Sequence, residues 1–253
     1  MHRPAAQLFF WTIICLTFAQ STVAQAQLVS NRTVNRLPES AVHGVSRAEQ
    51  INLNIVPLFG GRAKSLTQKA LDEQFLKDCD VSFKDRSEAC QFFCERGWEY
   101  LAEGELDTAM YRFNLAYLLN CHCSDTFWGM GVICFQREQL KDAVKLLNMG
   151  LEEDPKNAAL LADLATLHVN LYKKNKSESD LNRALELLNT SIEKDSNNAT
   201  TYLRFALAEF ERAGYTKAWE YVHKCRTIDM DSLDLEFLKN LQAKMPDPEG
   251  VFR

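Results

Sequence analysis

Small and large apolar residues recur along this chain at a nearly constant interval, and this recurrence limits its fold more than any other feature. The small residue stands at Ala109, Ala143, Ala184 and Ala218, with spacings of 34, 41 and 34 residues. The large residue stands at Phe93, Phe127, Leu161 and Tyr202, with spacings of 34, 34 and 41 residues. A period of this length is typical of stacked repeats, each of which is one supersecondary unit.

Two more positions keep the same register. Each large residue is followed four residues later by a small one, at Gly97, Gly131, Ala165 and Ala206. Each recurring alanine is followed four residues later by Phe113, Leu147, Leu188 or Val222. A spacing of four places two side chains on one helical face, one turn apart. We therefore expect each unit to be two antiparallel helices that bury their apolar faces only by stacking on neighbouring units.

With this pattern the chain resembles the tetratricopeptide repeat (TPR) family. The resemblance implies an all-α, right-handed α-solenoid of about four helix pairs, with repeats at residues 90–123, 124–157, 158–198 and 199–231. The closing proline of the family is replaced by Cys121, Ser196 and Met230 in repeats one, three and four. The phrases "GWEYLAEGELDTAMYRFNLAYLL" and "FWGMGV" are similar to exported TPR proteins of Bacteroidota-type Gram-negative bacteria, a resemblance that implies no enzymatic activity.

The segments that flank the repeats are expected to shield their ends. Residues 27–63 are predicted to be flexible or extended, because "INLNIVPLFGG" at 51–61 alternates apolar and other residues. Residues 64–86 are predicted to form an N-terminal capping helix that begins after Ser65 as its N-cap. Residues 232–245 are predicted as a C-terminal capping helix, followed by a tail at 246–253. The seven-residue excess of repeat three, around "KKNKSES", is expected to lengthen the turn between its helices.

The first residues have the features of an export signal. "LFFWTIICLTF" at 8–18 is an apolar run too short to span a bilayer with certainty, and "AQA" at 24–26 offers small residues for cleavage. We expect residues 1–26 to be a signal peptide and the mature chain to be periplasmic or secreted, with no later membrane span. The formal net charge of −5 is spread along the chain without a basic patch, so we expect a protein partner and no nucleic acid.

The TPR resemblance implies that the first helix of each repeat lines a concave face. By register, the side chains on this face are Trp98, Leu101, Trp128, Val132, Phe135, Leu203, Leu207 and Phe210. They predict an apolar groove for a peptide or helix, without the Lys, Asn and Arg of the family's carboxylate-clamp form. An alternative stays open, in which residues 51–61 cover this surface, because a large bare apolar patch is unusual on a soluble monomer.

The cysteines are expected to gather at one edge of the repeats. Removal of the signal peptide leaves seven of the eight cysteines, of which Cys79, Cys90, Cys94, Cys121 and Cys123 are predicted to lie at this edge with His122. One hypothesis is a disulfide that joins Cys90 or Cys94 to Cys121 or Cys123. A second is that these thiols are simply buried small hydrophobes. A metal site ranks third, because C-x-C and C-x3-C lack the usual paired C-x2-C spacing.

No catalytic set can be assembled from these residues, so we expect no enzymatic activity, no cofactor and no metal. The sequence favours a non-enzymatic protein–protein interaction scaffold of the cell envelope. Its alternative is an accessory subunit of an envelope enzyme or transport complex, or a metal- or redox-sensitive binder that uses the cysteine edge.

Overall fold

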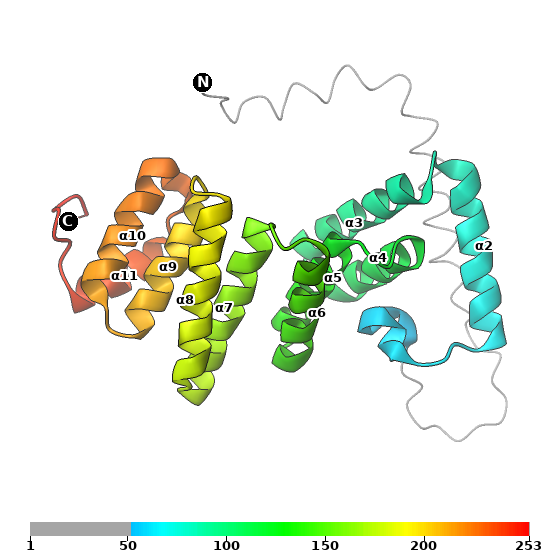
Figure 1. Ribbon diagram of the computed structural model, residues 1–253, viewed down its shortest axis with the longest axis horizontal. Helices are drawn as coiled ribbons and strands as arrows, with labels where there is room; N and C mark the ends of the chain where they lie inside the picture. Colours follow the sequence, from blue (N-terminus) through cyan, green and yellow to red (C-terminus); the bar gives the residue numbers. More distant parts are fainter. Residues whose placement is uncertain (1–51, 253) are drawn as a thin grey trace, which may run out of the picture. The chain divides into compact units, whose positions relative to one another are not determined.

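The structure is a computed structural model that describes residues 52–252 (Figure 1). The expected signal peptide lies outside the described residues. Every regular element from residue 52 to residue 252 is helical, which confirms the all-α prediction. The chain divides into two compact units, residues 1–122 and 123–253, and each is described by itself.

The first unit is built around one helical hairpin, α3 (Arg86–Ala102) and α4 (Leu106–Leu119). A Cβ on Gly97 would lie 2.7 Å from the ring of Phe113, so the small residue is what allows the two helices to approach this closely. The recurring glycine and the recurring large residue therefore meet across the hairpin. The turn between the helices passes through Gly104 at φ +81°, a backbone conformation that glycine adopts without strain.

Helix α2 (Leu66–Ser82) precedes this hairpin and packs against both of its helices. Ser65 caps it as predicted, since its hydroxyl oxygen accepts a hydrogen bond of 3.1 Å from the backbone N–H of Gln68. The buried Phe75 of α2 meets Phe93 edge-on, with 5.3 Å between the ring centroids. Helix α2 thus covers the apolar side of the hairpin, in the manner of a capping helix.

Residues 52–61 differ from the predicted extended conformation. They form two short 3-10 helices, η2 (Leu53–Ile55) and η3 (Pro57–Gly61), which pack against α4. Within η3, both Leu58 and Phe59 have left-handed backbone conformations at φ 53°, which non-glycine residues adopt at a cost of about 1–2 kcal/mol each. The alternation of apolar residues could not indicate this, because the conformation depends on contacts with a helix 55 residues further along the chain.

The buried side chain of Asn114, on α4, holds this segment in place. Its Oδ1 accepts a hydrogen bond of 3.3 Å from the N–H of Phe59. Its Nδ2 donates to the carbonyl oxygens of Asn54 and Val56, both at 2.8 Å. Phe59 itself is buried and lies beneath Lys64, whose ammonium is 3.3 Å from the ring centroid. One amide therefore satisfies three backbone groups of a distant segment.

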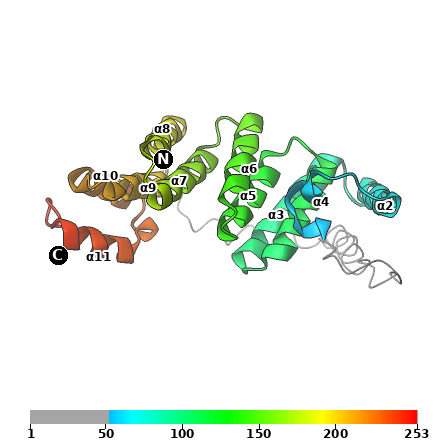
Figure 2. The ribbon, with the colours of Figure 1, turned by 90° about the horizontal axis from the view of Figure 1, so that it is seen from below.

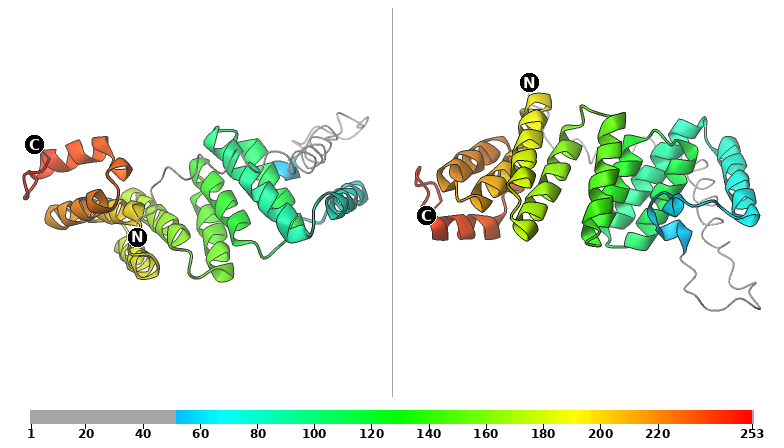
Figure 3. Two further views of the ribbon diagram at one scale, coloured as in Figure 1. Left: turned by 90° about the horizontal axis from the view of Figure 1, so that it is seen from above. Right: turned by 60° about the horizontal axis from the view of Figure 1, so that its bottom comes forward.

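The second unit contains three further hairpins and a terminal helix. They are α5 (Ser124–Gln136) with α6 (Leu140–Glu153), α7 (Ala158–Asn175) with α8 (Glu178–Lys194), α9 (Ala199–Glu211) with α10 (Tyr215–Ile228), and then η4 (Met230–Ser232) and α11 (Leu235–Lys244). Within each pair the two helices run antiparallel and pack closely (Figure 3). Here too the small residue faces the large one, since a Cβ on Gly131 would lie 2.7 Å from Leu147.

The seven-residue excess of repeat three lies in its helices, so the prediction of a longer turn is wrong. Helices α7 and α8 have 18 and 17 residues, whereas α5 and α6 have 13 and 14. The turn between α7 and α8 is short because Lys176 takes the left-handed conformation, at φ 54°, and ends α7 directly. "KKNKSES" therefore adds helical length at the end of this pair.

Helix α11 lies beside α10 and completes the second unit (Figure 2). Its Phe237, Leu238 and Leu241 are buried in one apolar cluster with Trp219 of α10. The indole N–H of Trp219 donates to the carbonyl oxygen of Met245, at 3.0 Å, so the chain after α11 returns across α10. Among the described residues, no helix combines the length and the apolar character that crossing a membrane would require.

Candidate functional site

In the second unit, the first helices of three successive hairpins are linked by side chains on one face. The indole N–H of Trp128, on α5, donates to one carboxylate oxygen of Asp163, on α7, at 2.6 Å. The other oxygen of Asp163 pairs with the guanidinium of Arg204, on α9, at 2.5 Å. We call this surface the α5–α7–α9 face, defined by Trp128, Asp163 and Arg204.

The same face carries a second pair further along the helices. Lys173 of α7 and Glu211 of α9 lie 3.2 Å apart. Glu211 follows Arg204 by seven residues, which places both on one side of α9. Lys173 follows Asp163 by ten residues, about 80° around α7, and its long side chain still reaches Glu211. The side chains of Asp163 and Arg204 are 22% and 23% exposed, which leaves them within reach of a binding partner.

This surface is more polar than the sequence predicted. It carries an arginine that the predicted groove did not include, since the guanidinium of Arg204 pairs with the carboxylate of Asp163. A signal was present in the sequence, because Asp163 and Arg204 are 41 residues apart, which is the offset between repeats three and four. They therefore occupy equivalent positions on α7 and α9, and opposite charges at equivalent positions of adjacent helices can meet.

The predicted groove residues fall into three groups. Trp128, Val132 and Phe135 lie on one face of α5 at helical spacing and are half-buried. Three others, Leu203, Leu207 and Phe210, pack against the apolar cluster of α10 and α11. The ring of Phe210, for example, lies 5.6 Å from that of Phe237. Phe210 therefore already contacts the C-terminal helix, and all three side chains are packed against a buried cluster, which leaves them less open to a partner than the sequence suggested.

The remaining two predicted groove residues belong to α3, in the first unit. Trp98 packs edge-on against Phe113 of the same hairpin, with ring centroids 5.4 Å apart, and Leu101 is buried. The segment proposed as a cover, residues 52–61, packs against α4, the second helix of this hairpin. Its position disfavours it as the cover of a surface formed by first helices.

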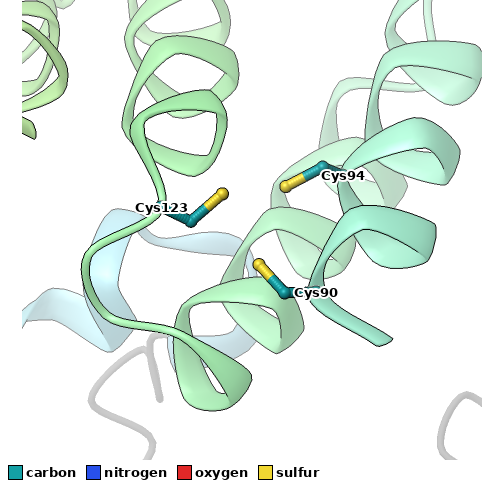
Figure 4. Close-up of side chains that lie close together, drawn as sticks. All are labelled: Cys90, Cys94 and Cys123. Carbon is teal, nitrogen blue, oxygen red and sulfur yellow. The ribbon is translucent and has the colours of Figure 1, made fainter. Parts of the chain in front are cut away.

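Three of the predicted edge cysteines come together. The sulfur atoms of Cys90, Cys94 and Cys123 all lie within 4.8 Å of one another (Figure 4). Cys90 and Cys94 are one turn apart on α3, and Cys123 is the N-cap residue of α5. Figure 4 shows the two sulfurs of α3 directed toward the side of Cys123. We call these three residues the cysteine cluster.

The other predicted edge residues lie outside this cluster. Cys121 and His122 are exposed in the turn that leads to Cys123. Cys79 is buried in α2, where burial, together with the charges of Asp78 and Asp80, raises the pKa of its thiol to about 12. Cys134 is buried in α5, and burial raises its pKa to about 11. Thiols with such pKa values stay protonated at neutral pH and are poor nucleophiles.

Comparison with known proteins identifies the fold. No family model and no curated protein matches the sequence. Among solved structures, a thermophilic TPR protein of Thermus thermophilus superposes with a TM-score of 0.57 at 16% identity, over 64% of this chain and 85% of that chain. A chain of the APC/C hetero-tetramer Cut9–Hcn1 superposes with a TM-score of 0.53 at 16% identity. That match covers 71% of this chain and 34% of the other.

These structures and the helix pairs described above define the class: the chain is an all-α repeat protein with the TPR fold. At 16% identity, the likeness extends to the fold alone.

Proposed function

We propose that this chain is an exported, non-enzymatic scaffold of the cell envelope, which binds a segment of another protein along the α5–α7–α9 face. The observation that carries the proposal is the link from Trp128 through Asp163 to Arg204, which aligns three first helices as one surface. The expected signal peptide supports export, and the net charge of −5 without a basic patch favours a protein partner over nucleic acid.

The composition of this face suits peptide recognition. Tryptophan and arginine are the residue types most enriched among side chains that dominate binding energy at protein interfaces. The half-buried Trp128, Val132 and Phe135 offer apolar contact along α5. Asp163 and Arg204 can respectively accept from and donate to the main chain of a bound peptide. The partner segment is therefore expected to be apolar on the side facing α5 and to present backbone or polar groups toward α7 and α9.

The same surface would serve an accessory subunit of an envelope complex. The APC/C structure of similar fold is itself a hetero-tetramer, which is consistent with the use of such helical surfaces in assembly. In either case the chemistry is binding, and the face has no need of a nucleophile or a general base.

Site-specific photo-crosslinking tests this proposal. A photoreactive amino acid is placed at Val132, on the face, and in a second variant at Glu186, an exposed position on α8. Both variants are expressed with residues 1–26 in the native cell, and crosslinked products from the envelope fraction are identified by mass spectrometry. We expect a discrete protein partner from position 132 and none from position 186.

A second substitution separates the polar link from general packing. Trp128→Phe keeps an aromatic ring and removes the indole N–H that bonds Asp163. It should lower the crosslinking yield at position 132 several-fold without unfolding the chain. Equal products from positions 132 and 186, or an unchanged yield with Trp128→Phe, would contradict binding at this face. Recovery of the chain only from the cytoplasmic fraction would contradict export.

A further inference from the structure

We propose that the second unit binds a small zwitterion, of the class of free apolar α-amino acids, in a cavity beside α10. This inference goes beyond the proposed scaffold function and stands independently of it. The cavity has a volume of about 550 Å³, which lies within the usual range of small-molecule sites. Its walls come from Tyr202 of α9, from the C-terminal half of α10 and from Glu249 of the chain after α11.

A buried imidazole supplies the first polar group of this cavity. The side chain of His223 is 9% exposed, and its Nε2 lies 2.8 Å from a carboxylate oxygen of Asp247. In the tautomer that donates from Nε2 to this carboxylate, Nδ1 is a hydrogen-bond acceptor. Nδ1 is buried without a hydrogen-bond partner, and 3.7 Å separates it from the carboxylate of Glu249. A donor that enters between Nδ1 and Glu249 can bond to both.

The groups on this side of the cavity are held in place before a ligand arrives. The ring of His223 stacks on those of Trp219 and Phe252, with centroids 5.8 and 5.9 Å away. The carboxylate of Asp247 also accepts a hydrogen bond of 3.0 Å from the backbone N–H of Glu249. Asp247 therefore positions both the imidazole and the residue opposite its Nδ1. Binding to such a preorganised site costs little side-chain or loop entropy.

Two basic side chains of α10 supply the groups for the opposite charge. Arg226 follows His223 by three residues, so their Cβ atoms are neighbours on the helix, about 5–6 Å apart. The Nε of Arg226 is buried without a hydrogen-bond partner, and a buried donor of this kind is stabilised by an acceptor. Lys224 lies on the exposed side of α10, with its ammonium 5.3 Å from the ring centroid of Tyr221.

The charges of the lining select the class of ligand. Lys224 and Arg226 bring two positive charges to the cavity. Glu220 and Glu249 bring two negative charges. A simple anion or cation would meet repulsion from one of these pairs, whereas a zwitterion is attracted by both. The ammonium of an α-amino acid can donate to Nδ1 of His223 and to Glu249, while its carboxylate accepts from Nε of Arg226.

The rest of the lining suits an apolar side chain. The hydroxyl of Tyr202 donates to the carbonyl oxygen of Ser196 at 3.1 Å, so its hydrogen is already used within the chain. The ring of Tyr202 and the half-buried Ile228 then offer apolar surface to the cavity. An amino acid such as leucine or phenylalanine can therefore bury its side chain there while its charged groups reach α10.

A titration followed by NMR tests the proposal. The chain comprising residues 27–253 is labelled with heavy nitrogen and titrated with L-leucine and with L-phenylalanine. Two analogues of leucine each lack one charge: isocaproate has no ammonium, and isoamylamine has no carboxylate. We expect saturable shifts of the amide signals of α10 and of residues 245–252 with the amino acids. Each analogue should bind at least about tenfold more weakly than leucine, because it loses a hydrogen bond between charged groups.

Matched variants locate the ligand. Arg226→Gln should weaken leucine binding at least about tenfold. Glu249→Gln should weaken it only about threefold, because this side chain is 59% exposed and its charge is screened by solvent. Arg183→Gln is the control and should bind like the wild type, since Arg183 is an exposed arginine of α8 outside the cavity. Circular dichroism checks that each variant remains helical.

Three results would overturn the proposal. The first is no saturable shift with either amino acid up to about 10 mM. The second is equal binding of leucine and one of its analogues, since the site would then recognise a single charge. The third is leucine binding by Arg226→Gln and Glu249→Gln that equals that of the wild type, which would place the ligand elsewhere in the chain.

Discussion

Replacement of Asn114 by leucine should release the N-terminal segment from the helical hairpin. The side chain of Asn114 has no exposed surface and bonds to three backbone groups of residues 54–59. Leucine has the same four side-chain heavy atoms branched at Cγ, so the substitution removes the hydrogen bonds and keeps the branched shape of the side chain. The backbone N–H of Phe59 keeps its bond of 3.1 Å to the carbonyl oxygen of Val56, which limits the loss.

The expected cost follows from the bonds that are broken. Each lost hydrogen bond contributes about 0.5–1.5 kcal/mol, and a buried carbonyl left without a donor costs about 1–3 kcal/mol. The three bonds of Asn114 therefore correspond to a loss of roughly 2–4 kcal/mol in the free energy of unfolding. The left-handed residues Leu58 and Phe59 add about 1–2 kcal/mol of strain each. Without the hydrogen bonds of Asn114, the segment relieves this backbone strain when it leaves α4.

A double comparison measures this effect. Asn114→Leu is made in a chain that begins at residue 27 and in one that begins at residue 62, and urea unfolding gives the stability of all four proteins. We expect the substitution to cost roughly 2–4 kcal/mol in the long chain and less than about 1 kcal/mol in the short chain, where its partners are gone. Protease digestion should also cut residues 52–61 faster in the long variant. An equal cost in both chains would refute the role assigned to Asn114.

Three further predictions concern other parts of the fold. Gly97→Ala should destabilise the chain by about 1–3 kcal/mol, because its Cβ would lie 2.7 Å from Phe113. In thermal unfolding, the additional substitution Phe113→Leu should recover part of this loss. Burial opposes ionisation of Asp247, but backbone N–H groups that donate to its carboxylate outweigh burial and lower its pKa. Its contribution to stability should therefore be complete above about pH 4 and disappear as the pH falls through the lowered pKa, and Asp247→Asn should flatten this part of the stability profile. At about pH 8, iodoacetamide should modify Cys79 and Cys134 far more slowly than free cysteine, because their pKa values are about 12 and 11. Labelling of either residue as fast as that of free cysteine, measured by mass spectrometry, would contradict this prediction.

The repeat spacing predicted the helical hairpins because it depends on local periodicity. The meeting of Gly97 with Phe113, and of Gly131 with Leu147, follows directly from positions that recur in register. Capping of α2 by Ser65 was predictable for the same reason, since an N-cap bonds within its own turn. The excess of repeat three was placed in a turn because its polar residues resemble a loop. Polar residues on the outer side of a long helix give the same composition.

Features that join distant segments could not be predicted as well. The left-handed turn at Leu58 and Phe59 opposes local preference and exists only because Asn114 bonds to it. The pairing of Asp163 with Arg204 required the register of two repeats to be compared position by position. Spacing alone ranked a metal site third among the cysteine hypotheses, because C-x-C and C-x3-C lack the usual paired C-x2-C spacing. Which cysteines meet depends on where α4 ends.

The turn after α11 has a consequence for self-association. Phe252 stacks on both Trp219 and His223 of α10, and four hydrogen bonds to Asp247 hold the intervening residues in place. Together with α11, this turn leaves Trp219 only 1% exposed, although it stands on the last hairpin of the second unit. A repeat array grows by adding a hairpin to an apolar end surface, and a second molecule can use the same surface to polymerise. Residues 245–252 cover part of this apolar end surface. Their removal is therefore expected to expose the surface and to favour self-association.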